Sequence, residues 1–193
     1  MTPSAGTAPD RLAPELVEPL QPLIAAYARS RLPLPRIDPV PAGELPEPYR
    51  ALLAHDRDMT PTLEAFHRSE IHIEVWSRAQ RENQYLREVV LRLDRNQRPV
   101  EFGANRVYLD AFEPSVRKLI LDEYLPLGQI LRLKAIPHAG HPTAFLRVEP
   151  DAQMRRAFGL HGAETRALYG RCNTIRDPQN RPLSQIVEIL CPV

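Results

Sequence analysis

Residues 86–109, LREVVLRLDRNQRPVEFGANRVYL, decide the fold, because apolar and polar side chains alternate on both sides of a polar turn. Alternation with a period of two is typical of a half-buried β-strand, so the stretch predicts two strands, 86–93 and 99–109. The polar run 94–98 between them predicts a hairpin turn. We therefore expect an antiparallel pair of strands here.

Similar patterns flank this hairpin. Alternation recurs in the expected strands 71–76, 143–148, 167–176 and 183–190, the last two forming a hairpin around Asp177–Asn180. Helical spacing is found at 14–30, where Pro19 and Pro22 break the first turns, and at 49–54, 114–133 and 151–158. A further helix is expected near residue 60, with Thr60 or Thr62 as its cap, and 114–133 is expected to break at 126–128. Hairpins with helices clustered elsewhere predict an α+β fold with an antiparallel sheet.

The composition excludes several classes of protein. The chain has 193 residues with a net charge of +1, which suits one globular domain and gives no overall attraction to nucleic acid. It lacks a long apolar stretch for a membrane helix, so we expect a cytoplasmic protein. The two cysteines, Cys172 and Cys191, are too few for a disulfide framework and are expected to be reduced. Residues 1–12 are expected to be disordered, and the proline-rich segment 31–48 to wrap around a single domain, 13–193.

Arg106 is the first candidate for chemistry, because it stands on a strand that should be half-buried. Its face is otherwise largely apolar, being shared with Val100, Phe102, Ala104 and Tyr108. Burying an unpaired guanidinium costs several kcal/mol. A ligand carboxylate, held bidentately, would be a suitable partner. Equally open is that Arg106 lies at the rim of the sheet and pairs with Asp110 or reaches water.

Glu188 poses the same question on the last strand, where its neighbours are apolar. A carboxyl in such a row has a raised pKa unless a cation compensates it. If the hairpin is tight, Glu188 lies opposite Arg171, and Tyr169, Arg171 and Glu188 share one face. That arrangement would gather an acid, a base and a phenol, although a purely structural pair of Arg171 and Glu188 remains an alternative.

Common cofactor motifs are missing from the sequence. There is no phosphate-binding loop, no Gly-x-Gly-x-x-Gly, no Cys-x-x-Cys, no His-Glu-x-x-His and no Gly-x-Ser-x-Gly. His138 and His141 lie three residues apart and would suit a metal, but no Cys, Asp or Glu stands near them in the loop. The pattern favours a surface loop over a metal site.

Four segments together resemble the chorismate lyase family, especially its divergent branch. Residues 55–64, HDRDMTPTLE, resemble the acid and Met-Thr segment of that family, and 99–106, PVEFGANR, its strand after the hairpin. Residues 125–131, LPLGQIL, resemble its Pro-Leu-Gly turn. The closing hairpin, with LYGR at 168–171 and an internal glutamate within 182–192, agrees as well. The order and spacing of the segments match from residue 55 to residue 192.

This resemblance implies a six-stranded antiparallel sheet with helices on one side and a closed pocket that holds 4-hydroxybenzoate under flaps. It implies a carbon–oxygen lyase that removes pyruvate from chorismate without a cofactor or a metal. By position, Arg106 would clamp the ring carboxylate and Glu188 would face the para oxygen as acid or base. In the classical members of the family the arginine directly follows the strand glycine, whereas here, as in the divergent branch, it stands two residues later, on the same face. The substrate-binding residues that we expect are Arg106, Arg171, Met59, Leu127, Gly128 and Tyr169.

Two other functions remain open. The pocket of the same fold can serve another small molecule of a biosynthetic pathway, by turnover or by binding alone. The fold also serves as the effector-binding module of bacterial transcription regulators, but the stretch before Tyr49 is too short and too rich in proline for their winged-helix DNA reader. The sequence therefore favours an enzyme with a small-molecule substrate, acting as a monomer or small homo-oligomer, without nucleic acid or membrane.

Overall fold

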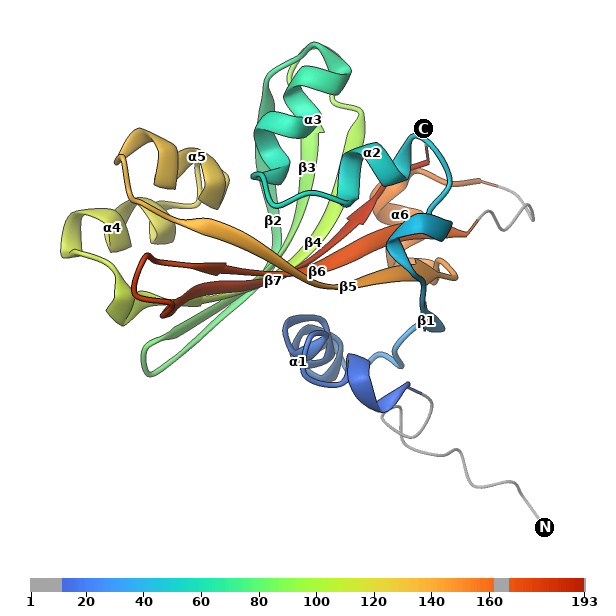
Figure 1. Ribbon diagram of the computed structural model, residues 1–193, viewed down its shortest axis with the longest axis horizontal. Coiled ribbons are helices and arrows are strands. Elements are labelled where there is room, and N and C mark those ends of the chain that lie inside the picture. Colours follow the sequence, from blue (N-terminus) through green and yellow to red (C-terminus); the bar gives the residue numbers. More distant parts are fainter. Residues whose placement is uncertain (1–11, 162–166, 193) are drawn as a thin grey trace.

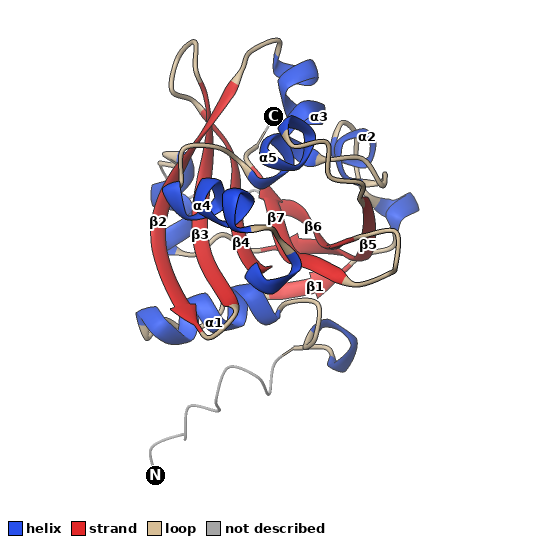
Figure 2. Ribbon diagram, turned by 90° about the vertical axis from the view of Figure 1, so that its left-hand side faces the viewer, coloured by secondary structure: helices blue, strands red, loops and turns tan. Residues whose placement is uncertain are grey.

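The computed structural model describes residues 12–161 and 167–192. In them an antiparallel sheet of seven strands runs in the order β1-β5-β6-β7-β4-β3-β2 (Figures 1 and 2). The strands are β1 (Ile37–Pro39), β2 (Ile71–Arg81), β3 (Gln84–Leu93), β4 (Pro99–Tyr108), β5 (Ala139–Val148), β6 (Leu168–Arg176) and β7 (Pro182–Leu190). The α-helices are α1 (Gln21–Ser30), α2 (Tyr49–Leu53), α3 (Met59–His67), α4 (Pro114–Asp122), α5 (Leu127–Leu133) and α6 (Ala152–Phe158). Short 3-10 helices span Pro14–Leu16, Ala42–Glu44 and Leu109–Ala111.

Both predicted hairpins form, and the α+β class with an antiparallel sheet is confirmed. In the first hairpin β3 pairs with β4, so that Val89 lies opposite Gly103. In the second, β6 pairs with β7, and Arg171 lies opposite Glu188 as the tight turn requires. The central strands β4 and β7 then pair with each other and join the two hairpins into one sheet.

The sheet has seven strands where six were expected. The additional strand, β1, lies inside the proline-rich segment 31–48 and pairs with β5 at the edge of the sheet. Proline lacks an N–H donor, but its backbone angles suit extended chain, so it is tolerated on an edge strand. A period-two pattern cannot reveal a strand of three residues.

The helices cover both faces of the sheet, not one as expected (Figure 1). One face packs against α1 and α6 through an apolar core that includes Leu23, Phe102 and Met154. The helices α2 to α5 cover the other face, with apolar cores around Leu53 and Ile130. Consecutive residues of β3, β4 and β7 are buried, so both faces of these strands need a cover.

Helix boundaries follow the prolines more closely than the expected caps. The break in 14–30 is real, since a 3-10 turn precedes α1. The expectation that Thr60 or Thr62 caps the third helix is wrong, because α3 begins at Met59 and Asp58 occupies the cap position. The predicted disorder concerns residues 1–12, of which 1–11 lie outside the described residues. No helix in the described ranges is long and apolar enough to cross a membrane.

Candidate functional site

A cavity that is partly open to solvent lies between the sheet and the helices α3 and α5. It measures about 40 Å³, which is room for about three water-sized groups. The polar side chains that line it from the sheet are Arg87, Glu101, Asn105, Asn173 and Glu188. The first residues of α3 and α5 close it from the opposite side, and these are Met59, Thr60, Leu127 and Gly128.

Arg87 is the most unusual side chain of this cavity. It is 1% exposed, and none of its three guanidinium nitrogens has a hydrogen-bond partner among the described residues. Glu123, whose charge acts on Arg87, is itself engaged by Arg78 and by the Tyr85 hydroxyl. Burial lowers the pKa of Arg87, but arginine starts so high that it stays charged at neutral pH. The cavity therefore contains a buried positive charge whose donors are free to bind an anion.

The register of the sheet places a row of polar groups beside Arg87. Arg87 on β3 lies opposite Asn105 on β4. Asn105 and Asn173 both lie opposite Ile186 of β7, on its two sides. The amide oxygens of both asparagines have no hydrogen-bond partner in the described part of the chain. These amides can bind a ligand beside the guanidinium.

Two carboxyl groups form the next part of the lining. Glu188 is 4% exposed and accepts a hydrogen bond of 2.5 Å from Nε of Arg171. Glu101 is equally buried, and its Oε2 atom has no partner among the described residues. Burial, and then the charge of Glu188, raise the pKa of Glu101 well above its usual range. One carboxyl group is thus paired with an arginine, and the other has a raised pKa and an oxygen without a partner among the described residues.

Arg171 is completely enclosed and does not line the cavity. Its guanidinium donates to Glu188 and to the backbone carbonyls of Leu53, His55 and Arg57. The segment between α2 and α3 is therefore tied to β6. Because its nitrogens are engaged in this way, Arg171 orients Glu188 and holds the segment in place.

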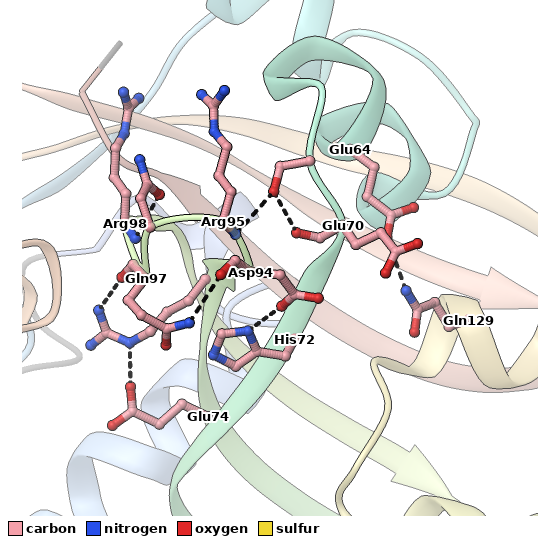
Figure 3. Close-up of polar contacts among 12 residues, drawn as sticks. Glu64, Glu70, His72, Glu74, Asp94, Arg95, Gln97, Arg98 and Gln129 are labelled. Atoms are coloured by element: carbon pink, nitrogen blue, oxygen red, sulfur yellow. Dashed lines mark hydrogen bonds and ion pairs between the residues drawn. The ribbon is translucent and has the colours of Figure 1, made fainter.

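Polar contacts connect the elements that close the cavity. Nε2 of Gln129 on α5 donates to Glu64 on α3 over 2.9 Å (Figure 3). Nε2 of His138 lies 3.1 Å from both carboxylate oxygens of Asp58, and its Nδ1 lies 2.7 Å from the carbonyl oxygen of Ile136. Both ring nitrogens thus face acceptors, so the arrangement suits the doubly protonated imidazolium. The hydrogen bond that His138 donates to Asp58 accordingly raises the pKa of His138.

The structure brings together some of the residues that the sequence singled out. Met59, Leu127, Gly128 and Glu188 line the cavity. Tyr169 shares the face of Glu188, but its ring packs against Tyr49 with ring centroids 5.0 Å apart, outside the cavity lining. The predicted pairing of Arg171 with Glu188 is present in the structure.

Arg106 does not line the cavity that Glu188 lines, although the two were expected to hold opposite ends of one ligand. Successive residues of a strand face opposite sides, so Arg106 of β4 shares the α1 face with Phe102. Its Nη1 donates to Gln185 on β7 over 3.1 Å. Glu188 stands three residues after Gln185, hence on the other face. An argument from strand parity shows which residues share a face, but not which face carries the cavity.

The sequence analysis did not single out four residues that line the cavity, namely Arg87, Glu101, Asn105 and Asn173. The signal for Arg87 was present in the sequence, because Arg87 interrupts an apolar row with Val89 and Leu91 as Arg106 interrupts its own row. Glu101 likewise stands between Val100 and Phe102. Both faces of these strands are buried, so every charge on them raises the same question. Only the packing of the helices shows which of these charges face the cavity and which face the opposite side of the sheet.

The two histidines considered for a metal site do not come together as ligands. His138 is engaged with Asp58 and Ile136, as described above, and His141 lies on β5. In the described ranges, no group of three or more His, Cys, Asp and Glu side chains is placed to hold a metal ion.

Solved structures share this fold. The effector domain of PhnF from Mycobacterium smegmatis matches 69% of this chain and 88% of its own, with 15% identity and a TM-score of 0.51. PhnF from the same organism matches 70% of this chain with 14% identity and a TM-score of 0.50, and this chain spans 64% of its length. A transcriptional regulator of the GntR family from Bacillus cereus matches 64% of this chain and 93% of its own, with 10% identity and a TM-score of 0.46. At such identities the likeness shows the fold alone.

No family model matches the chain, and no curated protein matches it.

The comparisons contradict the expectation of a carbon–oxygen lyase. The similar structure with a TM-score of 0.51 is an effector domain, not a lyase. The segments that resemble chorismate lyase lie on strands and covering helices that frame a cavity. Such a frame can host binding or turnover, so the resemblance is explained by the fold without implying the reaction.

Proposed function

We propose that this chain is a small-molecule-binding domain whose cavity takes a small organic acid, with Arg87 as the partner of the ligand carboxylate. The observation that carries the proposal is the buried guanidinium whose three nitrogens have no hydrogen-bond partner among the described residues. A planar guanidinium matches a carboxylate in two parallel hydrogen bonds. Each charge-assisted bond contributes roughly 1.5–3 kcal/mol.

The surroundings of Arg87 support an anionic ligand. Burying a charge without a partner destabilises a protein by several kcal/mol, and a native fold retains such a charge where a function uses it. Apolar side chains complete the lining and would exclude water from the ion pair, namely Ile73, Val89, Leu91, Ile175 and Ile186. The likeness of the fold to the effector domain of PhnF favours binding over turnover.

A ligand of more than a few atoms requires the cover to open, because the cavity measures about 40 Å³. The contacts that resist opening are those of Glu64 with Gln129 and of Asp58 with His138. Both join separate segments over the cavity, so a movement of α3 away from α5 would break them. We infer that larger acids bind by such a movement.

The first test is a binding screen with small carboxylates. Aliphatic, hydroxylated and aromatic acids are compared by isothermal titration calorimetry and by the shift of the melting temperature. The wild-type protein, Arg87→Met and Arg106→Met are measured side by side. Arg106 is the matched control, because it is an arginine of the adjacent strand that points to the opposite face.

The proposal predicts that at least one acid binds to the wild-type protein and to Arg106→Met, and that Arg87→Met loses this binding. The corresponding neutral amides are expected not to bind, because they lack the charge that Arg87 compensates. Equal binding to the wild-type protein and Arg87→Met, or no binding by any acid of the panel, would overturn the proposal.

A further inference from the structure

We propose that Glu101 determines which acids bind: its protonated carboxyl donates a hydrogen bond to an uncharged oxygen at the end of the ligand remote from the carboxylate. This inference rests on the proposed function, because it takes Arg87 as the partner of the ligand carboxylate. The ligand class that follows is a carboxylic acid with a second, neutral oxygen acceptor such as a ketone. An amino acid with an ammonium group at that end is disfavoured.

The position of Glu101 places it in the cavity and beside Glu188. Gly103, two residues on along β4, lies opposite Glu188. A Cβ atom on Gly103 would lie 3.1 Å from Oε1 of Glu101, so the carboxyl of Glu101 extends over this glycine. The absence of a side chain at position 103 thus leaves the space in which the two carboxyl groups meet.

No cation among the described residues is hydrogen-bonded to Oε2 of Glu101, although the charge of Arg171 acts to lower its pKa. The guanidinium of Arg171 is bonded to Glu188 and to three backbone carbonyls. Two neighbouring carboxyl groups that share one engaged guanidinium hold one negative charge more easily than two. Burial and the neighbouring Glu188 raise the pKa of Glu101 in the same sense. Its carboxyl therefore carries a proton, and Oε2 has no partner among the described residues.

Arg87 and Glu101 bind different ends of a ligand. Asn105 lies opposite Arg87, and Glu101 stands four residues before Asn105 on the same strand. At 3.3 Å per residue this separates their backbone positions by roughly 13 Å. Both side chains line the same cavity. A ligand whose carboxylate binds Arg87 therefore extends along β4 toward Glu101.

The test uses matched acids that differ only at the remote end. One set is pentanoate, levulinate and 5-aminopentanoate, and the other is benzoate, 4-acetylbenzoate and 4-(aminomethyl)benzoate. Each set contains an unsubstituted acid, a ketone and an ammonium compound. Dissociation constants are measured by calorimetry for the wild-type protein, Glu101→Gln and Glu101→Met. Glutamine keeps a neutral donor of the same shape, whereas methionine removes it.

In at least one set we expect the ketone to bind roughly tenfold more tightly than the unsubstituted acid, as for one buried hydrogen bond. Glu101→Gln should keep this preference and Glu101→Met should lose it. Tighter binding of the ammonium compound, loss of the ketone preference in Glu101→Gln, or no ketone preference in either set would overturn the inference. The last result would leave the proposed function intact if the acids still depend on Arg87.

A second measurement does not depend on any ligand. Infrared difference spectra of the wild-type protein and Glu101→Gln at neutral pH should show the carbonyl stretch of a protonated carboxylic acid in the wild type only. A carboxylate signal instead would overturn the inference whichever acids bind. If no acid binds at all, the proposed function fails and the inference fails with it, even if the protonated signal is present.

Discussion

Replacing Arg87 by methionine is expected to stabilise the free protein. The guanidinium is 1% exposed without a partner among the described residues, and such an ion costs several kcal/mol. Methionine is unbranched and flexible, so it suits the space of the arginine stem. By analogy with buried ionic groups replaced by apolar ones, we expect a gain of about 1–3 kcal/mol in the free energy of unfolding. For a chain of this length each kcal/mol raises the melting temperature by roughly 2–4 °C.

The same substitution should abolish binding of the acid. Loss of two charge-assisted hydrogen bonds, at roughly 1.5–3 kcal/mol each, weakens binding by at least about a hundredfold. Thermal and urea unfolding without ligand measure the first effect, and calorimetry measures the second. Arg106→Met should keep the affinity for the acid, since its guanidinium lies on the other face, where it donates to Gln185. A less stable Arg87→Met protein with unchanged affinity for the acid would refute the reasoning.

Three further predictions concern stability. Folding raises the pKa of Glu101. Its contribution to stability is therefore present below about pH 4, the pKa in the unfolded chain, and is lost as the pH rises through the pKa in the folded protein. The melting temperature of Glu101→Gln relative to wild type should accordingly increase from acid to alkaline pH. The pKa of His138 is also raised, by Asp58. His138→Gln should therefore lower the free energy of unfolding in mildly acidic buffer. Urea unfolding should show this difference from wild type shrinking as the pH rises through the pKa of His138 in the folded protein. In Gly170→Ala, the new Cβ would lie 2.4 Å from a backbone carbonyl oxygen of β7, so we expect the free energy of unfolding to fall by about 2 kcal/mol or more. The control is Gly43→Ala, where nothing lies within 4 Å of the new Cβ. It should unfold like wild type in the same thermal scans.

The local pattern was sufficient for the two hairpins. The alternation in 86–109 predicted β3, the turn and β4, because a turn between two period-two runs has few other solutions. The compact turn at Asp177–Asn180 likewise set the register that places Arg171 opposite Glu188. Register follows from turn geometry, which is local. The break before α5 at Pro126 was equally visible from the sequence.

The site required information that is not local. Arg87 and Arg106 occur on adjacent strands, each in an apolar row, and sequence spacing treats them alike. Their difference comes from the packing of α1 on one face and of α3 and α5 on the other. The strand β1 was missed for a related reason, because its three residues become a strand only through pairing with β5.

The sequence by itself determined the strands of the two hairpins and their registers. It did so because backbone alternation and turn chemistry act between near neighbours. Only the tertiary structure decided which face of the sheet holds the cavity and which buried charges have partners there. Arg171 is neutralised by Glu188 and backbone carbonyls, whereas Arg87 has no partner among the described residues. That distinction depends on groups brought together from distant parts of the chain, because pairing of a buried charge is decided by what folds against it.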